Sequence, residues 1–302
     1  MRIVLGQNQY GKEQVRVVRV QRGPESHRIK DLSVSISLSG DLDDTHLGRD
    51  NSKVLVTDTQ KNTVYAFAKE HGINEIEDFG ILLARHFVDS HPPIHRSRVR
   101  IEEYSWNAAL PPESLDAESA PPAQHAFTRS GSETRTAEVV YDGTQFSVTC
   151  GLTGLHAFKT SGSQFQGFAQ DRYTTLLDTA DRVMTPAITA RWRHRTTTDD
   201  GPSDGWTRAH HRTRTHMLQA FADTYSFSQQ QTLYAMGTRM LEHRGELDEV
   251  RLSLRNMHHL AVDLNPFDLD NDNEVFYAPD RPYGIMEGTV LREGATARIP
   301  TD

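Results

Sequence analysis

Several polar residues in the first part of the sequence are of types that bind small molecules or move protons. Lys12 ends the stretch G-Q-N-Q-Y-G-K, and Thr57 and Asp58 stand in V-T-D-T-Q-K-N-T-V-Y. An amine, a hydroxyl and a carboxylate can each donate or accept a proton. Taken singly, these residues also have ordinary structural interpretations. Thr57 is spaced from Gln60 as in a capping box, and Lys12 suits a solvated turn.

The second half of the chain carries a different set of groups: an aromatic ring, a guanidinium, carboxamides and an imidazole. A guanidinium donates hydrogen bonds, a carboxamide both donates and accepts them, and an imidazole can carry a proton. Each group again has a structural alternative, as a core aromatic, a surface cation or a polar residue at a helix start. The residues are Phe165, Arg182, Gln229, Gln230, Asn256 and His258.

A metal site is an obvious alternative, because the chain has 15 histidines. The histidines at 86–95 and 210–216 lack the HExxH spacing and have no cysteine nearby. Asp268 opens a run that imitates a calcium loop, but Asn273 and Pro279 stand where that loop needs glycine and glutamate. The dinucleotide, P-loop and nucleophile-elbow motifs are absent. The sequence therefore predicts neither a metal nor an organic cofactor.

Composition favours a small-molecule partner. The chain has 302 residues, which exceeds one typical domain, so two domains are expected. Its apolar runs are too short to cross a bilayer, and a formal net charge of -8 argues against a nucleic-acid partner. The opening Met-Arg-Ile-Val-Leu-Gly lacks the features of a secretory signal, so a cytoplasmic protein is expected. Cys150 lies in an alternating apolar pattern, which favours a packed core thiol.

The elements that must position these residues follow two different periods. Residues 31–40 alternate apolar residues with serine, as a half-exposed strand does, and 15–20 predict the strand before it. Two apolar stripes at helical spacing predict a helix pair over 57–90. The second capping box of this pair is expected at Asn74 and Glu77. Residues 107–123, rich in Ala, Pro, Ser and Glu, are predicted to form a solvated loop.

The second half repeats the order of strands, helix pair and strands. Asp142-Gly143 predicts a tight hairpin, and helical spacing runs over 206–221 and again from Ser228, which is expected to cap its helix. Residues 250–254 and 285–291 are predicted strands. Because strands and helices are segregated, we expect an α+β fold with antiparallel sheets and helices on one face.

Taken in order along the chain, the motifs resemble those of the cofactor-independent urate oxidase family. The two stretches that contain Lys12 and Thr57 occur in the family's order. They are followed by S-G-S-Q-F-Q-G-F-A-Q-D-R-Y-T-T-L, D-R at 181–182, Q-Q-T-L-Y, L-R-N-M-H-H and Y-A-P-D-R-P-Y-G. Ordered matches over the whole chain are more specific than any single motif. One departure is Met257, which stands where the family commonly has lysine.

The resemblance implies a role for each matched residue. The catalytic set would be Lys12, Thr57 and His258, and the substrate-binding set Thr57, Asp58, Phe165, Arg182, Gln229, Gln230 and Asn256. The substrates would be urate, O2 and water, the products 5-hydroxyisourate and hydrogen peroxide, and no metal or cofactor would take part. Two alternatives remain open at this point: a related enzyme that acts on a pterin, and a purine-binding protein without catalysis.

The resemblance also implies an architecture. The family is built of two tandem tunnelling-fold (T-fold) domains, each with a four-stranded antiparallel sheet and a helix pair on one face. In this chain the domains would be 1–134 and 135–302. Family members form homotetramers with active sites at subunit interfaces. The chain ends in Pro300-Thr301-Asp302 instead of a peroxisomal tripeptide, which again favours a cytoplasmic, bacterial-type enzyme.

Overall fold

The computed structural model describes residues 3–24, 26–109, 125–195 and 201–301. Contacts divide the chain into two compact units: unit 1 is Met1–Cys150 with Thr196–Thr207, and unit 2 is Gly151–Arg195 with Arg208–Asp302. The domain boundary expected after residue 134 stays a prediction, because a grouping by contacts measures compactness and not where a tandem repeat begins.

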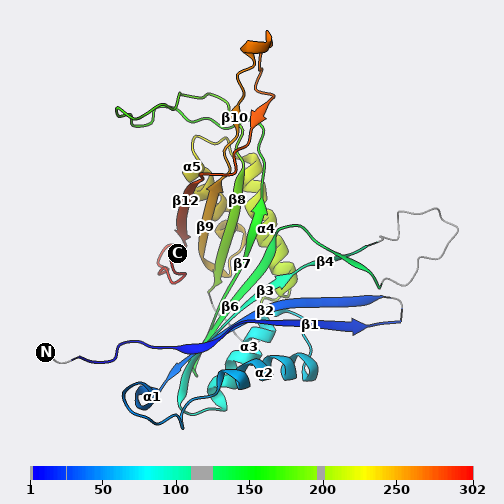
Figure 1. Cartoon of the computed structure of the whole chain (residues 1–302), viewed down its shortest axis with the longest axis vertical. Helices are drawn as coiled ribbons and strands as arrows, with labels where there is room; N and C mark the ends of the chain where they lie inside the picture. The colour runs from blue at the N-terminus through cyan, green and yellow to red at the C-terminus, as the bar shows by residue number, and fades with distance from the viewer. Residues whose placement is uncertain (1–2, 25, 110–124, 196–200, 302) are drawn as a thin grey trace. The chain divides into compact units, whose positions relative to one another are not determined.

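Unit 1 contains an antiparallel sheet with the strand order β1-β2-β3-β6. Figure 1 shows α2 and α3 together on one side of these strands. The elements in chain order are β1 (Tyr10–Arg22), β2 (His27–Gly40), α1 (Asp43–Leu47), α2 (Thr57–Glu70), α3 (Ile76–Asp89), β3 (Ile94–Tyr104), β4 (Trp106–Ala108), β5 (Phe127–Arg129) and β6 (Thr134–Tyr141).

The strand predicted at 31–40 is confirmed, but its serine face is not exposed as predicted: Ser33 is buried, and Ser35 and Ser37 are half-buried. The apolar face of β2 builds the core of unit 1. Leu32, Val34 and Ile36 are fully buried. The facing stripe of α3 is spaced as one side of a helix, and its members Ile76, Phe79, Leu83 and Phe87 are buried. A Cβ at Gly80 would lie 2.8 Å from Val139 Cγ2, so glycine lets α3 approach the sheet closely.

Unit 2 repeats the plan of two strands, two helices and two strands. The strand order is β7-β8-β9-β12, and all recorded pairings are antiparallel. Its elements are β7 (Phe146–His156), which begins in unit 1, β8 (Pro186–His194), α4 (Trp206–Asp223), α5 (Gln229–His243), β9 (Leu247–Asn256), β10 (Leu260–Ala261), a 3-10 turn (Asn265–Phe267), β11 (Phe276–Tyr277) and β12 (Gly284–Leu291). The fold is therefore the expected α+β arrangement of two T-fold domains in tandem.

The hairpin predicted at Asp142-Gly143 joins β6 to β7. Gly143 has a φ of 87°, which glycine adopts without strain. The hydroxyl of Thr144 and the backbone N–H groups of Thr144 and Gln145 donate to the Asp142 carboxylate and lower its pKa to about 2. Cys150 on β7 is buried, as predicted for a core thiol.

Two predicted capping boxes are wrong, and one cap is confirmed. Val56 is the N-cap of α2, with Thr57 as the first helical residue, because the Gln60 side chain turns inward and donates to the Leu55 carbonyl at 3.1 Å. The N-cap of α3 is Glu75, which makes no side-chain cap. Ser228 does cap α5, accepting a hydrogen bond from the Gln231 N–H at 3.1 Å.

The predicted loop at 107–123 begins as a strand. Asn107 and Ala108 belong to β4, which pairs with β5, since backbone pairing there supplies hydrogen-bond partners that composition does not reveal. Residues 110–123 of that predicted loop lie outside the described residues.

A buried ion pair lies between α3 and β6 in unit 1. Glu77 is fully buried, and Arg135 donates to it at 2.7 Å and to Glu75 at 3.2 Å. The Cys150 thiol donates to the other Glu77 oxygen at 3.4 Å. Burial raises the pKa of Glu77, and the neighbouring guanidinium opposes that rise. The pair therefore depends on both partners being present.

We expect Arg135→Met to destabilise the protein strongly, because it leaves the Glu77 carboxyl buried without its cation, a loss of about 3–5 kcal/mol. The double variant Arg135→Met/Glu77→Leu should recover part of the loss. Arg100→Met, which removes a partly exposed pair with Glu138, is the control and should cost at most about 1 kcal/mol. Urea unfolding at one pH measures all three, and a double variant less stable than Arg135→Met would contradict this account.

Candidate active site

The first group of predicted site residues lies in unit 1, where β1 runs beside the start of α2. Lys12 belongs to β1, and Thr57 is the first residue of α2. The Tyr10 hydroxyl accepts a hydrogen bond from the Leu55 N–H at 2.9 Å. Tyr10 and Lys12 share one face of β1, because alternate residues of a strand point the same way. This contact therefore ties the strand that carries Lys12 to the chain just before Thr57.

Asp58 completes this group at the protein surface. Lys61 forms an ion pair with its carboxylate at 2.5 Å, and the Asn62 amide donates to it at 3.2 Å. These contacts lower the pKa of Asp58, with Lys61 the main cause and the charge of Lys12 a smaller one. The helix α2, which begins with Thr57 and Asp58, packs against β1, which carries Lys12.

A β-bulge directly after Lys12 sets the direction of this part of β1. Lys12 pairs with Ile36, and the regular register resumes only at Val15. Between them Gln14 has a φ of 55°, and its N–H donates to the Ser35 hydroxyl at 3.0 Å. Bulges bend a strand and re-aim its side chains. The bulge therefore separates the register of Lys12 from that of the rest of β1.

The second group lies in unit 2, on chain outside the main sheet. Phe165 exchanges two backbone hydrogen bonds with Thr179, at 2.9 and 3.0 Å, and this bridge brings Arg182 near Phe165. The guanidinium carbon of Arg182 lies 5.0 Å from the centroid of the Phe165 ring. Ser163 holds Arg182 through a backbone bond at 2.7 Å and a weak side-chain bond at 3.4 Å. Burial lowers the pKa of Arg182, although an arginine remains charged in proteins.

The start of α5 lies beside this pair. Ser163 and Ser226, both fully buried, form a backbone bridge, and Ser226 precedes the cap residue of α5. Gln229 and Gln230 are the first residues of the helix; Gln229 is buried with no partner for its Oε1, and Gln230 is exposed. A helix start presents free N–H groups and partial positive charge, which favour an anion.

Asn256 and His258 follow at the end of β9. The Asn256 amide nitrogen lies 3.2 Å from Nδ1 of His258. Between them the Met257 N–H donates to the Thr185 carbonyl at 2.9 Å, which joins this segment to the chain that follows Arg182. In unit 2 the structure therefore connects the segments that carry the predicted aromatic, cationic, amide and imidazole groups.

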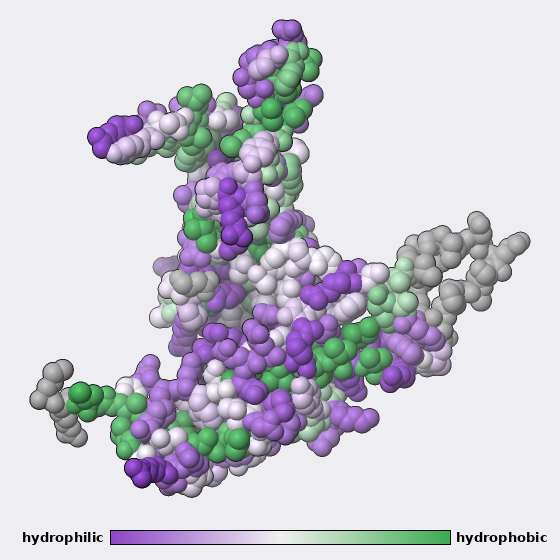
Figure 2. Space-filling model, in the orientation of Figure 1, coloured by the Kyte–Doolittle hydropathy of each residue, from purple (hydrophilic) through white to green (hydrophobic). Residues whose placement is uncertain are grey.

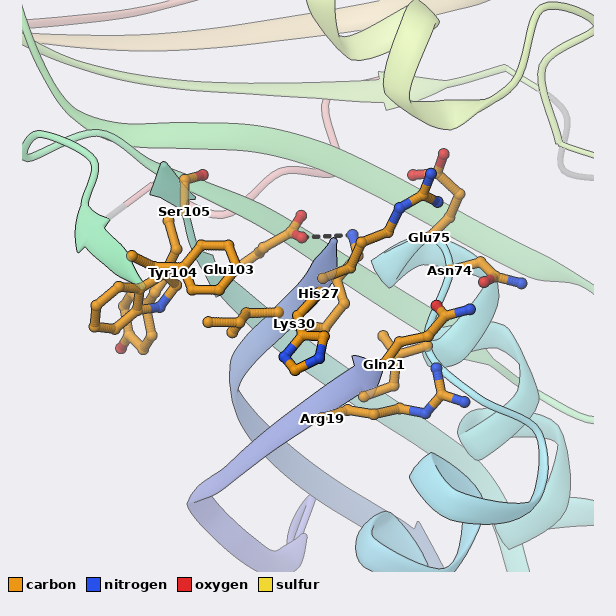
Figure 3. Close-up of a pocket in the computed structure, with 14 residues that line it drawn as sticks. Arg19, Gln21, His27, Lys30, Asn74, Glu75, Glu103, Tyr104 and Ser105 are labelled. Atoms are coloured by element: carbon orange, nitrogen blue, oxygen red, sulfur yellow. Dashed lines mark hydrogen bonds and ion pairs between the residues drawn. The ribbon is translucent and has the colours of Figure 1, made fainter. Parts of the chain in front are cut away.

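A surface hollow of about 530 Å³ in unit 1 is separate from these residues. Figure 3 shows it at the far ends of β1 and β2, near the turn between α2 and α3. Lys30 forms an ion pair with Glu103 at 2.5 Å inside it, and Glu75 is paired with Arg135. None of the predicted site residues lines it. The hollow is polar, and these charged groups are already paired.

Some supporting residues were not among the predicted site residues. Tyr10, Ser163 and Lys159 hold the segments described above through hydrogen bonds to backbone or side-chain groups. One sequence signal could have drawn attention to Lys159, which is the only lysine after Lys69.

In the described ranges, no three side chains among His, Cys, Asp and Glu gather as metal ligands would. No helix in that part of the chain is long and apolar enough to span a membrane.

Comparison with known proteins agrees with the motifs. The sequence model of a family described as Uricase matches residues 8–140 and 148–287. The chain is 42% identical over 299 residues to a uricase from Arthrobacter globiformis, covering 99% of this chain and 93% of that one. It is 33% identical over 288 residues to a uricase from Dictyostelium discoideum, covering 94% and 96%.

Solved structures show the same likeness. The crystal structure of the uricase from Arthrobacter globiformis matches with a TM-score of 0.89 and 42% identity, and the match covers 99% of each chain. A urate oxidase from Bacillus sp. TB-90 matches with a TM-score of 0.79 and 25% identity over 95% of this chain and 100% of that one. The family model and the relatives at 42% and 33% identity extend over nearly the whole sequence, and this chain belongs to the uricase family.

Proposed function

We propose that this chain oxidises urate with O2 and water to 5-hydroxyisourate and hydrogen peroxide, without a metal or organic cofactor. The substrate supplies two electrons, which reduce O2 to peroxide. Water supplies the hydroxyl oxygen that is added to the purine. Atoms balance when one urate, one O2 and one water give one molecule of each product.

The observation that carries this proposal is the pairing of Arg182 with Phe165. Urate is a planar anion with adjacent carbonyl and N–H groups. A guanidinium fork beside an aromatic ring offers such an anion bidentate hydrogen bonds at its edge and an apolar surface for its face. The bridges described above hold the Arg182 guanidinium over the Phe165 ring, 5.0 Å from its centroid, and Phe168 stacks on the same ring with centroids 5.0 Å apart. Urate would therefore stack on Phe165 only after Arg182 or Phe168 moves aside. Base stacking on an aromatic ring contributes about 1–3 kcal/mol.

The start of α5 supports the same binding mode. Gln230 would use its carboxamide to donate and accept hydrogen bonds in the plane of the purine, completing a clamp with Arg182. Gln229 would contribute its backbone. The helix start favours the negative charge that urate carries and that grows when a second proton leaves.

The catalytic step begins with removal of that second proton. A lysine is a base only in its neutral form, so Lys12 would accept the proton while neutral, and Thr57 would relay it. Asp58 would contact the edge of the substrate next to Lys12 and Thr57. The resulting dianion is electron-rich enough to reduce O2 directly, and the substrate takes the place of a cofactor.

Asn256 and His258 are assigned to the O2 and water side of the ring. The Asn256 amide would hold O2, and later the attacking water, above the purine. His258 lies within hydrogen-bond distance of that amide and would orient it and the relay. Hydrogen peroxide leaves before water adds, so one amide can serve both steps in turn.

We propose that the active enzyme is a homotetramer in which Lys12, Thr57 and Asp58 of one subunit meet the second group of a neighbour. Unit 2 carries apolar side chains at its surface that a second chain could cover. Figure 2 shows hydrophobic residues on the projection formed by β10, β11 and the turn between them. Examples are Leu260 at 52% exposed, Phe267 at 69% and Tyr277 at 63%. The domain division 1–134 and 135–302 and a cytoplasmic location remain predictions from the sequence.

The two alternatives are less well supported. Membership in the uricase family favours a urate oxidase over a T-fold enzyme that acts on a pterin. A purine-binding protein without catalysis would need the clamp but would have no use for the Lys12 and Thr57 pair.

The direct test is urate consumption by purified protein. We expect loss of urate absorbance with equimolar release of hydrogen peroxide, at the same rate with and without excess chelator. Elemental analysis and the visible spectrum of the same sample serve as controls for a bound metal or chromophore. A stoichiometric metal whose removal abolishes turnover would show that the proposed chemistry is wrong.

We expect Arg182→Lys to weaken urate binding strongly, because an ammonium cannot reproduce the planar fork. Losing a charge-assisted hydrogen bond costs about 1.5–3 kcal/mol, roughly tenfold to a hundredfold in affinity. Calorimetric binding of the non-reactive purine 8-azaxanthine measures the effect without turnover. Arg172→Lys is the matched control, since Arg172 is an exposed arginine in the same segment and should leave the affinity unchanged. Wild-type affinity in Arg182→Lys would remove Arg182 from the clamp.

Lys12→Met and Thr57→Ala should each lower kcat sharply with a smaller effect on urate binding, because the relay acts in the chemical step. The double variant should be little worse than the worse single variant, since residues that act as a unit are not additive. Steady-state kinetics with wild-type and variant enzymes measure both. Full additivity of the two losses would indicate separate roles.

Subunit mixing checks the shared site. Inactive Thr57→Ala chains and inactive Arg182→Ala chains, mixed under conditions of subunit exchange, should form some sites with neither defect, so activity should partly return. Each variant alone is the control. If mass spectrometry shows mixed tetramers and no activity returns, the two groups do not meet across subunits.

A further inference from the structure

Lys159 in unit 2 closes the end of a helix with its side chain. Its Nζ donates to the carbonyl oxygens of Phe221 at 3.3 Å, Ala222 at 3.3 Å and Thr224 at 2.5 Å. These carbonyls lie where α4 ends at Asp223. The last carbonyls of a helix lack partners within the helix and carry partial negative charge. An ammonium group placed there donates hydrogen bonds to these carbonyls and offsets their partial negative charge.

The backbone of Lys159 is tied to the chain that carries Arg182. Lys159 and Met184 exchange two hydrogen bonds, each 2.9 Å long, and Met184 stands two residues after Arg182. A short irregular segment with bends at residues 161–162 leads from Lys159 to Ser163, which itself holds Arg182. The backbone of Lys159 is therefore connected to Arg182 in two ways, through Met184 and through Ser163.

The side chain of Lys159 is tied to the chain that leads into α5. Two residues after Thr224, the Ser226 N–H donates to the Gly162 carbonyl at 2.9 Å, and the Ser226 carbonyl accepts from the Gln164 N–H at 2.8 Å. These bonds flank Phe165 on one side and the α5 cap on the other. Lys159 therefore joins the segments that carry Phe165, Arg182 and the start of α5.

Lysine suits this position better than arginine. Three carbonyl oxygens lie around one nitrogen, and an ammonium carries three donors on one nitrogen. A guanidinium spreads its donors over a planar fork and cannot direct them to one point in this way. Lys159 is the only lysine after Lys69, in a stretch where every other strong base is arginine. Burial also lowers the pKa of Lys159, with the charge of Asp223 opposing.

We propose that Lys159 is a positioning residue for urate binding, which fixes the Phe165 and Arg182 segments against the end of α4 and the entry to α5. It does not touch the substrate. This inference rests on the proposed function for its kinetic consequence, but the link between the segments is a property of unit 2 itself.

The test uses the full-length enzyme with Lys159→Met and Lys159→Arg. We expect both variants to raise the KM for urate and the Kd for 8-azaxanthine about tenfold, because Phe165 and Arg182 would no longer be held in one binding geometry, while kcat at saturating urate stays within about twofold. The control is Lys53→Met, which removes a partly exposed ammonium that is paired with Asp44 and should change neither constant.

A second readout does not depend on activity. Hydrogen exchange of the amides in 162–165 and 226–230 should be faster in Lys159→Met, with the amides of β9 unchanged. A folded Lys159→Met with wild-type KM, Kd and exchange would overturn the proposal, and so would a loss confined to kcat. If Lys159→Met does not fold, Lys159→Arg is judged by the same measurements. If the wild type oxidises no urate, the proposed function is wrong, and the exchange comparison alone decides whether Lys159 links these segments.

Discussion

The backbone bridge between Phe165 and Thr179 is the contact on which the substrate-binding group of unit 2 depends. It lies outside the main sheet, and it acts together with the backbone bonds of Ser163 to Arg182 and of Gln164 to Ser226. Because the bridge fixes Thr179 beside Phe165, it also places Arg182, three residues later, close to the Phe165 ring. A planar anion needs its edge and its face contacted at the same time. Two distant residues can do this only if the backbone between them is held in one conformation.

In each unit the helices and strands hold the irregular segments that carry candidate site residues. In unit 2 the helix α5 packs tightly on the sheet, since a Cβ at Gly237 would lie 2.5 Å from Val290 Cγ2, and its capped start meets the buried Ser226. In unit 1 the Leu55 N–H is bound by Tyr10 and the Leu55 carbonyl by Gln60, which holds the chain before Thr57 from both sides. Some candidate residues stand at the ends of these elements, where the backbone is fixed: Thr57 and Asp58 begin α2, Gln229 and Gln230 begin α5, and Asn256 ends β9.

Much of the fold followed from local pattern. The alternation from Leu32 to Leu38 predicted a half-exposed strand, and the apolar stripe from Ile76 to Phe87 predicted a helix, because one-sided burial imposes those periods. The turn at Asp142-Gly143 and the cap at Ser228 were predicted from residue types that satisfy backbone groups within a few positions. The choice of site residues came from ordered resemblance, since Lys12, Arg182 and His258 singly resemble ordinary surface residues.

The sequence by itself determined the α+β class, the two helix pairs and the family, because these depend on periodicity and on motifs read in order. Only the tertiary structure decided that Val56 caps α2, that β1 bulges after Lys12, and that Lys159 reaches the end of α4. Each of these features involves a partner far away in the sequence. Tyr10 binds the Leu55 N–H before α2, Gln14 binds the Ser35 hydroxyl, and Lys159 binds the carbonyls at the end of α4. A local pattern records which groups need partners, but the fold determines which partners come within reach.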